Sequence, residues 1–144
     1  MYTITPVLAA APGLGGLSGL LKVLTFLALL AGPVLMAIFG FLYLKRPNAE
    51  GNRNLGPRIF CGTGSAEAWQ FTRRLSGLVF GGLGLGLTAI MLIVAIIAMF
   101  QALNTVANIF LICMIIEAVL TVAAYAAVNI IVAKNFDRNG NRKK

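Results

Sequence analysis

Three long apolar blocks constrain what this chain can fold into more than any other feature. They cover residues 23–44, 76–100 and 107–133, and Glu117 is the only charged residue inside them. Each block exceeds the roughly 18 apolar residues that indicate a membrane span. At about 1.5 Å per residue they extend about 33 to 40 Å as helices, enough to cross a bilayer with some tilt. The sequence therefore predicts an all-α integral membrane protein, a bundle of three helices that leaves no room for a second globular domain.

The basic residues predict how the bundle is oriented. The segment 45–75 and the tail 134–144 carry most of the chain's 12 Lys and Arg residues, whereas the turn 101–106 carries no charge. Because cytoplasmic segments collect Lys and Arg, we expect segment 45–75 and the C-terminus inside and the N-terminus outside. The sequence pI of about 10.2 then reflects topology and does not indicate a nucleic-acid partner. The basic tail either keeps the C-terminus on the inner side of the membrane or contacts anionic headgroups.

The first 22 residues are apolar but rich in Gly and Pro. They lack the basic leader and small-residue cleavage site of a signal peptide. We expect an outer or interfacial lead-in, with Lys22 reaching the headgroups, and an earlier start of the first span near Leu14 is the alternative.

Glycine and proline mark two further features of the predicted spans. Gly32-Pro33 predicts a kink in the first span. In the second, Gly77-x-x-x-Gly81 and Gly82-x-x-x-Gly86 favour a helix crossing or a dimer face, since small residues let backbones approach in lipid. Alternatively, glycine is simply common in membrane helices.

Glu117 lies inside the third predicted span, on a polar stripe with Thr121 and Tyr125. A carboxylate there must be paired, protonated or facing water, because burial disfavours its charged form. One hypothesis is a proton- or ligand-responsive site that faces the bundle interior. The other is a neutral acid that holds the bundle together through a hydrogen bond.

Catalysis has little support in the composition. The chain has no His and only four acidic residues, so it offers neither an imidazole base nor a carboxylate dyad. Cys61 falls in the predicted cytoplasmic segment and Cys113 in a span, which argues against a mutual disulfide. We expect a protein that is not an enzyme and has no metal or cofactor.

Segment 45–75 carries a multi-point pattern of polar and small residues. Its members are Asn52, Gly56, Arg58, Ser65, Glu67, Trp69, Thr72 and Arg74. This spacing, within an arrangement of one span, a basic loop and two spans, resembles the SdpI family of bacterial membrane proteins. The resemblance covers about residues 23–134, and Ile59 stands where the family pattern has Thr.

Local physics gives the second half of this pattern a shape. Ser65 is a suitable N-cap for a helix over residues 66–74, and Glu67 suits its first turn. We expect that helix to run directly into the second span, with Arg73 able to stack on Trp69 near the inner interface. These residues then either anchor the chain at the interface or form a cytoplasmic recognition surface.

Two functions remain open. The resemblance implies an immunity or signalling protein of the bacterial plasma membrane, which binds a peptide toxin, engages a cytoplasmic regulator, or does both. The alternative is a subunit of a small transporter or channel, with Glu117 and the glycine-rich span lining a path. Three helices scarcely enclose a pore, so the alternative requires a homo-oligomer.

Overall fold

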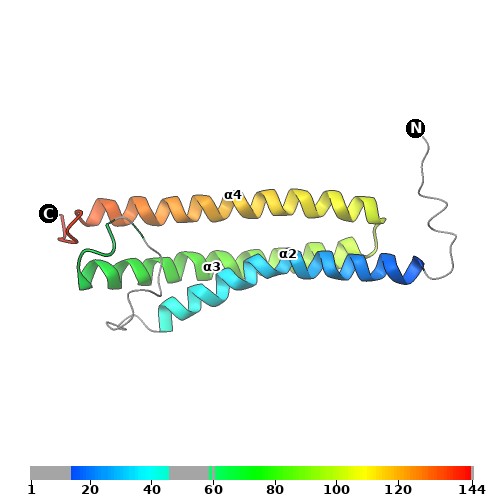
Figure 1. The fold of residues 1–144 in the computed structure, drawn as a ribbon, viewed down its shortest axis with the longest axis horizontal. Helices are drawn as coiled ribbons and strands as arrows, with labels where there is room; N and C mark the ends of the chain where they lie inside the picture. Colours follow the sequence, from blue (N-terminus) through cyan, green and yellow to red (C-terminus); the bar gives the residue numbers. More distant parts are fainter. Residues whose placement is uncertain (1–13, 46–58, 60, 144) are drawn as a thin grey trace.

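The computed structural model describes residues 14–45, 59 and 61–143, and within them it contains three long helices (Figure 1). These are α2 (Leu14–Lys45), α3 (Ala66–Met99) and α4 (Leu103–Asn135). Each helix is long and apolar enough to cross a membrane, so the predicted all-helical fold is confirmed. Residues 1–13 of the predicted lead-in 1–22 and the positions Asn52, Gly56 and Arg58 lie outside the described residues.

The helices are longer than the apolar blocks that predict them. At about 1.5 Å per residue the 34 residues of α3 extend about 51 Å, against about 30 Å for a hydrocarbon core. As predicted, α3 begins at Ala66 and continues through the second apolar block without a break. α2 begins at Leu14, ahead of the predicted span at Val23, which agrees with the alternative start. Glycines are tolerated there because a membrane helix satisfies its backbone hydrogen bonds internally.

The closest helix packing joins α2 to α3. A Cβ added at Gly40 would collide with the backbone of Gly81, and one added at Gly84 would collide with the backbone of Ala37. By contrast, a Cβ at Gly82 or Gly86 would meet nothing within 4 Å. The predicted crossing is therefore found at the Gly77–Gly81 motif, while the second motif faces away from the α2 contact.

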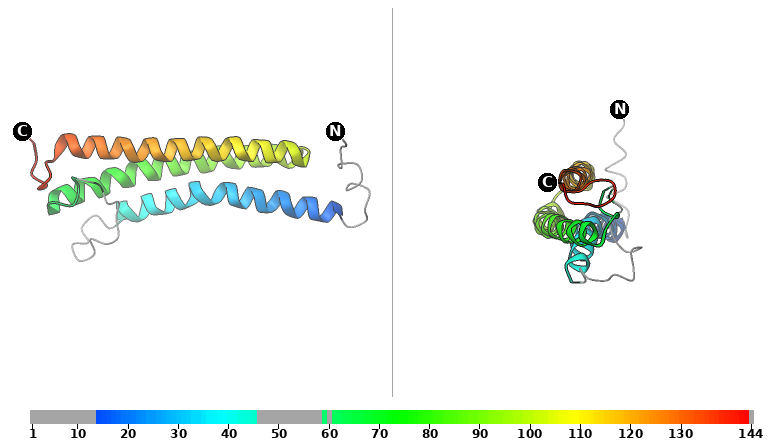
Figure 2. Two further views of the ribbon diagram at one scale, coloured as in Figure 1. Left: turned by 45° about the horizontal axis from the view of Figure 1, so that its top comes forward. Right: turned by 90° about the vertical axis from the view of Figure 1, so that its left-hand side faces the viewer.

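α4 contacts both other helices, but less extensively than they contact each other. Figure 2 shows the three helices running lengthwise side by side. α2 bends along its length, so its last turns diverge from α4 (Figure 1), and Pro33 lies inside this helix. Because proline removes one backbone hydrogen bond and crowds the preceding turn, Pro33 explains the bend that the sequence predicted.

Lys22 joins two helices at the end of the bundle that holds the α3–α4 turn. Its Nζ donates to the carbonyl oxygen of Gln101 at 2.6 Å and to that of Met99 at 3.3 Å. The lysine thereby satisfies carbonyls that the end of α3 leaves without helical partners. The expected position of Lys22 near the headgroups stays a prediction.

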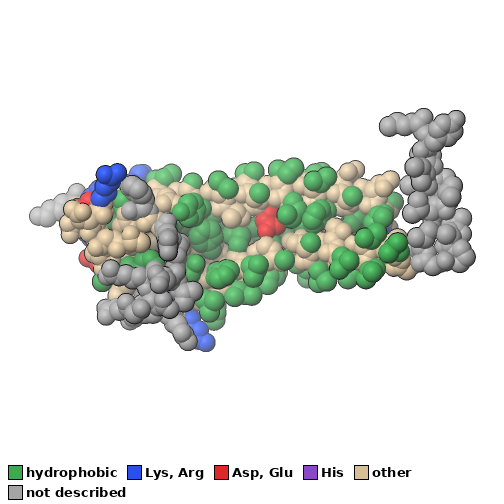
Figure 3. All heavy atoms as spheres, viewed as in Figure 1, with side chains coloured by type: hydrophobic (Ala, Val, Ile, Leu, Met, Phe, Trp, Pro, Cys, Tyr) green, Lys and Arg blue, Asp and Glu red, His purple; other side chains and the backbone are tan. Residues whose placement is uncertain are grey.

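The outward surface of the bundle is apolar along most of its length. Figure 3 shows hydrophobic side chains over the middle of the face, with Lys and Arg gathered toward the end that holds the C-terminus. Large side chains such as Leu85, Ile93 and Val122 are more than half exposed. A monomer in water does not expose so continuous an apolar surface, so we assign these faces to contact with lipid. The direction in which the bundle crosses the membrane stays a prediction.

Candidate functional site

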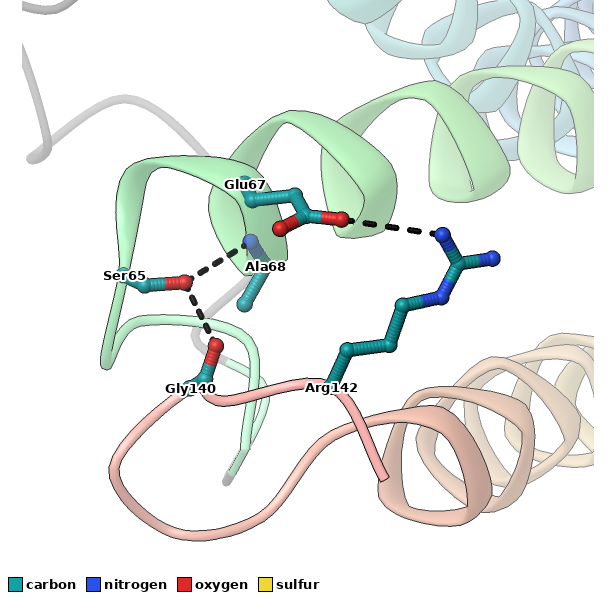
Figure 4. Close-up of polar contacts among 5 residues, drawn as sticks. All are labelled: Ser65, Glu67, Ala68, Gly140 and Arg142. Atoms are coloured by element: carbon teal, nitrogen blue, oxygen red, sulfur yellow. Dashed lines mark hydrogen bonds and ion pairs between the residues drawn. The ribbon is translucent and has the colours of Figure 1, made fainter. Parts of the chain in front are cut away.

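The start of α3 is fixed by Ser65, as the sequence predicted. The Ser65 hydroxyl oxygen accepts a hydrogen bond from the backbone N–H of Ala68 at 3.1 Å, in extended backbone geometry typical of an N-cap. The same hydroxyl donates to the carbonyl oxygen of Gly140 at 2.6 Å (Figure 4). Ser65 therefore caps α3 and also ties the C-terminal tail to it, across 75 residues of sequence.

The tail that meets Ser65 is a tight loop organised by Asp137. One carboxylate oxygen of Asp137 accepts from the backbone N–H of Asn139 at 3.0 Å and of Asn141 at 2.7 Å. The hydrogen bond from Asn141 is the main reason that the pKa of this carboxyl lies below its ordinary value. Gly140 completes the loop with φ of 78°, a conformation that favours glycine.

An apolar cluster lies beneath the loop. Phe136 is 1% exposed and packs on Phe71, with ring centroids 5.4 Å apart. Ile59 is 2% exposed in the same cluster. Cys61 is buried there as well, and both it and Cys113 are free thiols, as expected. The cluster holds the tail against α3 independently of any charge.

A groove of about 600 Å³ lies where the start of α3 meets the end of α4 and the tail. Its lining mixes both signs of charge with amide and aromatic groups, and the residues are Leu44, Glu67, Gln70, Phe71, Arg74, Asn135, Phe136 and Arg142. Glu67 and Arg142 approach to 3.8 Å with both side chains about two-thirds exposed. An exposed pair of this kind adds little stability, so its charges stay accessible to a partner. We call this the basic-end groove.

The opposite face of α3 buries polar groups near the first turns. Trp69 and Arg73 are each 5% exposed, and Thr72 is fully buried. Arg73 lies over the ring of Tyr43, with its Cζ 5.9 Å from the centroid. Arg73 therefore contacts α2 and does not stack on Trp69 as expected. Trp69 is enclosed by protein, which differs from the expected anchor at the membrane interface.

A second groove lies inside the bundle, between α2 and α4. It has a volume of about 430 Å³, and its lining comprises Gly32, Leu35, Met36, Phe39, Tyr43, Phe80, Glu117, Thr121 and Tyr125. The predicted polar stripe of Glu117, Thr121 and Tyr125 is thus brought to one wall. Thr121 donates to the carbonyl oxygen of Glu117 at 2.8 Å and has the sulfur of Met36 at 3.4 Å. We call this the Glu117 groove.

The structure thus places the predicted site residues that it describes in different surroundings. Glu67 and Arg74 line the basic-end groove, Ser65 fixes its geometry, and Trp69 and Thr72 are buried behind it. The intramembrane residues form the separate Glu117 groove. Sequence reasoning missed Gln70, Gly140 and Arg142. The only local signal was the turn-forming run Asp137-Arg-Asn-Gly-Asn141, which predicts a loop but not its partner.

Metal binding finds no support in the described part of the chain, where no group of three or more His, Cys, Asp or Glu side chains could hold an ion. Comparisons with protein-family models, with curated proteins and with solved structures give no match to this chain.

Proposed function

We propose that this chain is a non-enzymatic immunity or signalling protein of the bacterial plasma membrane, similar in kind to the SdpI family. In this proposal the N-terminus lies outside and the C-terminus in the cytoplasm. Support comes from the multi-point spacing of segment 45–75 and from the excess of Lys and Arg in that segment and in the tail. The protein binds a peptide toxin and engages a cytoplasmic regulator.

The observation that carries the regulator proposal is the basic-end groove. The tail and α3 together present Glu67, Gln70, Arg74 and Arg142 around one hollow. Carboxylate, amide and guanidinium groups at fixed spacing select a polar protein segment by complementary charges and hydrogen bonds. The Ser65–Gly140 hydrogen bond fixes the position of the two walls relative to each other.

Arg74→Ala tests the proposal against a matched variant. Both Arg74 and Lys134 are exposed cations near the same end of the bundle, but only Arg74 lines the groove. Charge-assisted hydrogen bonds contribute about 1.5–3 kcal/mol, so we expect Arg74→Ala to weaken regulator binding about tenfold or more. Lys134→Ala should leave it unchanged. The measurement combines survival of sensitive bacteria challenged with a membrane-active peptide toxin and recovery of the regulator with membranes.

Insertion is checked for both variants by membrane fractionation. Wild-type protein that gives no protection against the toxin peptide contradicts the immunity proposal. Equal regulator recovery with Arg74→Ala and Lys134→Ala contradicts the assignment of the regulator to the basic-end groove.

A further inference from the structure

The carboxylate of Glu117 is buried within the bundle without a described partner. Glu117 is 9% exposed, and its Oε2 has no hydrogen-bond partner among the described residues. The one ion pair found in the described part of the chain joins Glu67 to Arg142 and does not involve Glu117. Leaving a buried carboxylate charged and unpaired is unfavourable, so this side chain is either protonated or paired with a group that the described residues do not supply.

The helices make room for the carboxylate but do not bind its free oxygen. A Cβ added at Gly32 would collide with Glu117 Oε1, so the absence of a side chain at this position gives the carboxylate its space. Thr121 is the nearest hydroxyl on the same helix face, and its bonds go to the Glu117 carbonyl oxygen and the Met36 sulfur. Oε2 is closed off as well as unpartnered, while the Glu117 side chain lines the Glu117 groove, so a group that enters the groove meets this side chain.

The rest of the groove is apolar and rich in aromatic rings. Phe39, Tyr43, Phe80 and Tyr125 contribute to its walls, from all three helices. Its volume of about 430 Å³ falls within the roughly 300–1,000 Å³ of small-molecule pockets. Phe39 and Tyr125 are exposed at its margin, and Figure 3 shows an acidic side chain among hydrophobic ones, away from both ends. The groove therefore opens sideways, toward lipid.

We propose that the Glu117 groove binds a membrane-partitioned organic cation, an apolar body with one ammonium or other onium group that pairs with the Glu117 carboxylate. Aromatic faces attract cations in addition to their apolar contact. Phe39, Phe80 and Tyr125 offer such faces, whereas the ring of Tyr43 already carries the Arg73 guanidinium. A lipid tail would fill the walls but leave the carboxylate unpaired. A second copy of the chain brings no Lys or Arg from its apolar blocks 23–44, 76–100 and 107–133, in the last of which Glu117 lies.

Tetraphenylphosphonium is the probe, and tetraphenylborate is its control of matched shape and opposite charge. Binding is measured by equilibrium dialysis on the full chain in nanodiscs of zwitterionic phosphatidylcholine, with empty nanodiscs subtracted. We expect saturable binding of the cation and none of the anion. Glu117→Gln keeps the shape of the side chain and should weaken binding at least tenfold. Glu67→Gln removes the same charge outside the groove and should leave binding unchanged.

A labelling experiment on the unmutated protein covers the case in which Glu117→Gln does not fold. Dicyclohexylcarbodiimide modifies carboxyl groups in apolar surroundings, and mass spectrometry locates the modified residue. We expect tetraphenylphosphonium, but not tetraphenylborate, to slow modification of Glu117. Unsaturable binding of the cation, equal binding of both ions, undiminished binding by folded Glu117→Gln, or modification unaffected by the cation would each overturn the proposal. None of these outcomes bears on the basic-end groove.

Discussion

At the scale of single residues, Ser65 shows where sequence reasoning succeeds and where it stops. Its capping role follows from neighbours within three positions and is confirmed by the bond from Ala68. Its second bond, to Gly140, joins positions 75 residues apart and has no local signature. Residue types predict contacts within one helical turn, because the backbone fixes those distances. Contacts between residues far apart in the sequence can be predicted only when the packing of the helices is known.

Ser65→Ala removes both hydrogen bonds of this hydroxyl at once. Loss of the cap costs about 0.5–2 kcal/mol, and loss of a typical second hydrogen bond costs about 0.5–1.5 kcal/mol. We therefore expect the free energy of unfolding to fall by about 1–3 kcal/mol. The measurement is reversible unfolding in mixed micelles, followed by fluorescence of Trp69, the only Trp.

Thr63→Ala is the control, because Thr63 lies exposed in the same loop and no hydrogen bond of its side chain was found. Equal stability of the Ser65 and Thr63 variants would show that the tail is held by the Phe136 cluster alone.

Arg73 and Lys22 likewise make contacts that their sequence neighbours do not predict. Spacing on one helix suggested that Arg73 contacts Trp69, but its guanidinium lies over Tyr43 of another helix. The ammonium of Lys22 binds carbonyls 77 and 79 residues away, a contact with no local signature in the sequence. Long, flexible cationic side chains reach several partners. Which partner they contact depends on helix packing.

At the scale of elements, the sequence predicted that glycines in α3 allow close packing but not which glycines do so. Two consecutive motifs are offset by five residues, and only one can face α2. The packed face contains Gly77, Gly81 and Gly84, all buried. Gly82 and Gly86 are open. The position of α2 determines which face of α3 packs. Gly40 of α2 contributes to this contact, because it lies against the backbone of Gly81.

Gly84→Ala and Gly82→Ala form a matched pair on this helix. The new methyl group at position 84 would press on the backbone of Ala37, with its Cα at 2.9 Å, and backbone cannot yield as a flexible side chain does. Overpacking of this kind costs about 1–3 kcal/mol. Gly82→Ala meets no neighbour within 4 Å and should be neutral, or stabilising by up to about 1 kcal/mol.

Equilibrium unfolding in mixed micelles again measures both variants. A stability loss that is equal for Gly82→Ala and Gly84→Ala would contradict the observed α2–α3 contact. A loss confined to Gly82→Ala would indicate that the outward face packs against another copy of the chain.

At the scale of the whole molecule, hydropathy predicted three helices and their order, because length and apolarity are properties of the chain itself. It did not predict how far the helices extend beyond the apolar blocks. The grooves could not be predicted either, since each is lined by more than one element. For the Glu117 groove, the stripe on α4 was visible in the sequence, but its aromatic walls come from α2 and α3 as well.

Cysteine labelling tests the predicted orientation of the bundle. Ala102→Cys and Asn139→Cys place exposed thiols at opposite ends, while the native Cys61 and Cys113 are buried. A membrane-impermeant maleimide should label Ala102→Cys in intact cells and Asn139→Cys only after permeabilisation. The unsubstituted protein reports background labelling. The reverse pattern would place the basic end outside and remove the basis for a cytoplasmic regulator.

The glycine contacts between α2 and α3 also make the bundle mechanically uneven. Where two backbones touch, separation breaks many contacts at once, so this pair acts as a stiff frame. α4 is held mainly through side chains and is the more compliant arm. The Glu117 groove lies between this arm and the frame. A displacement of α4 would therefore alter the width of this groove more readily than it would alter the α2–α3 contact.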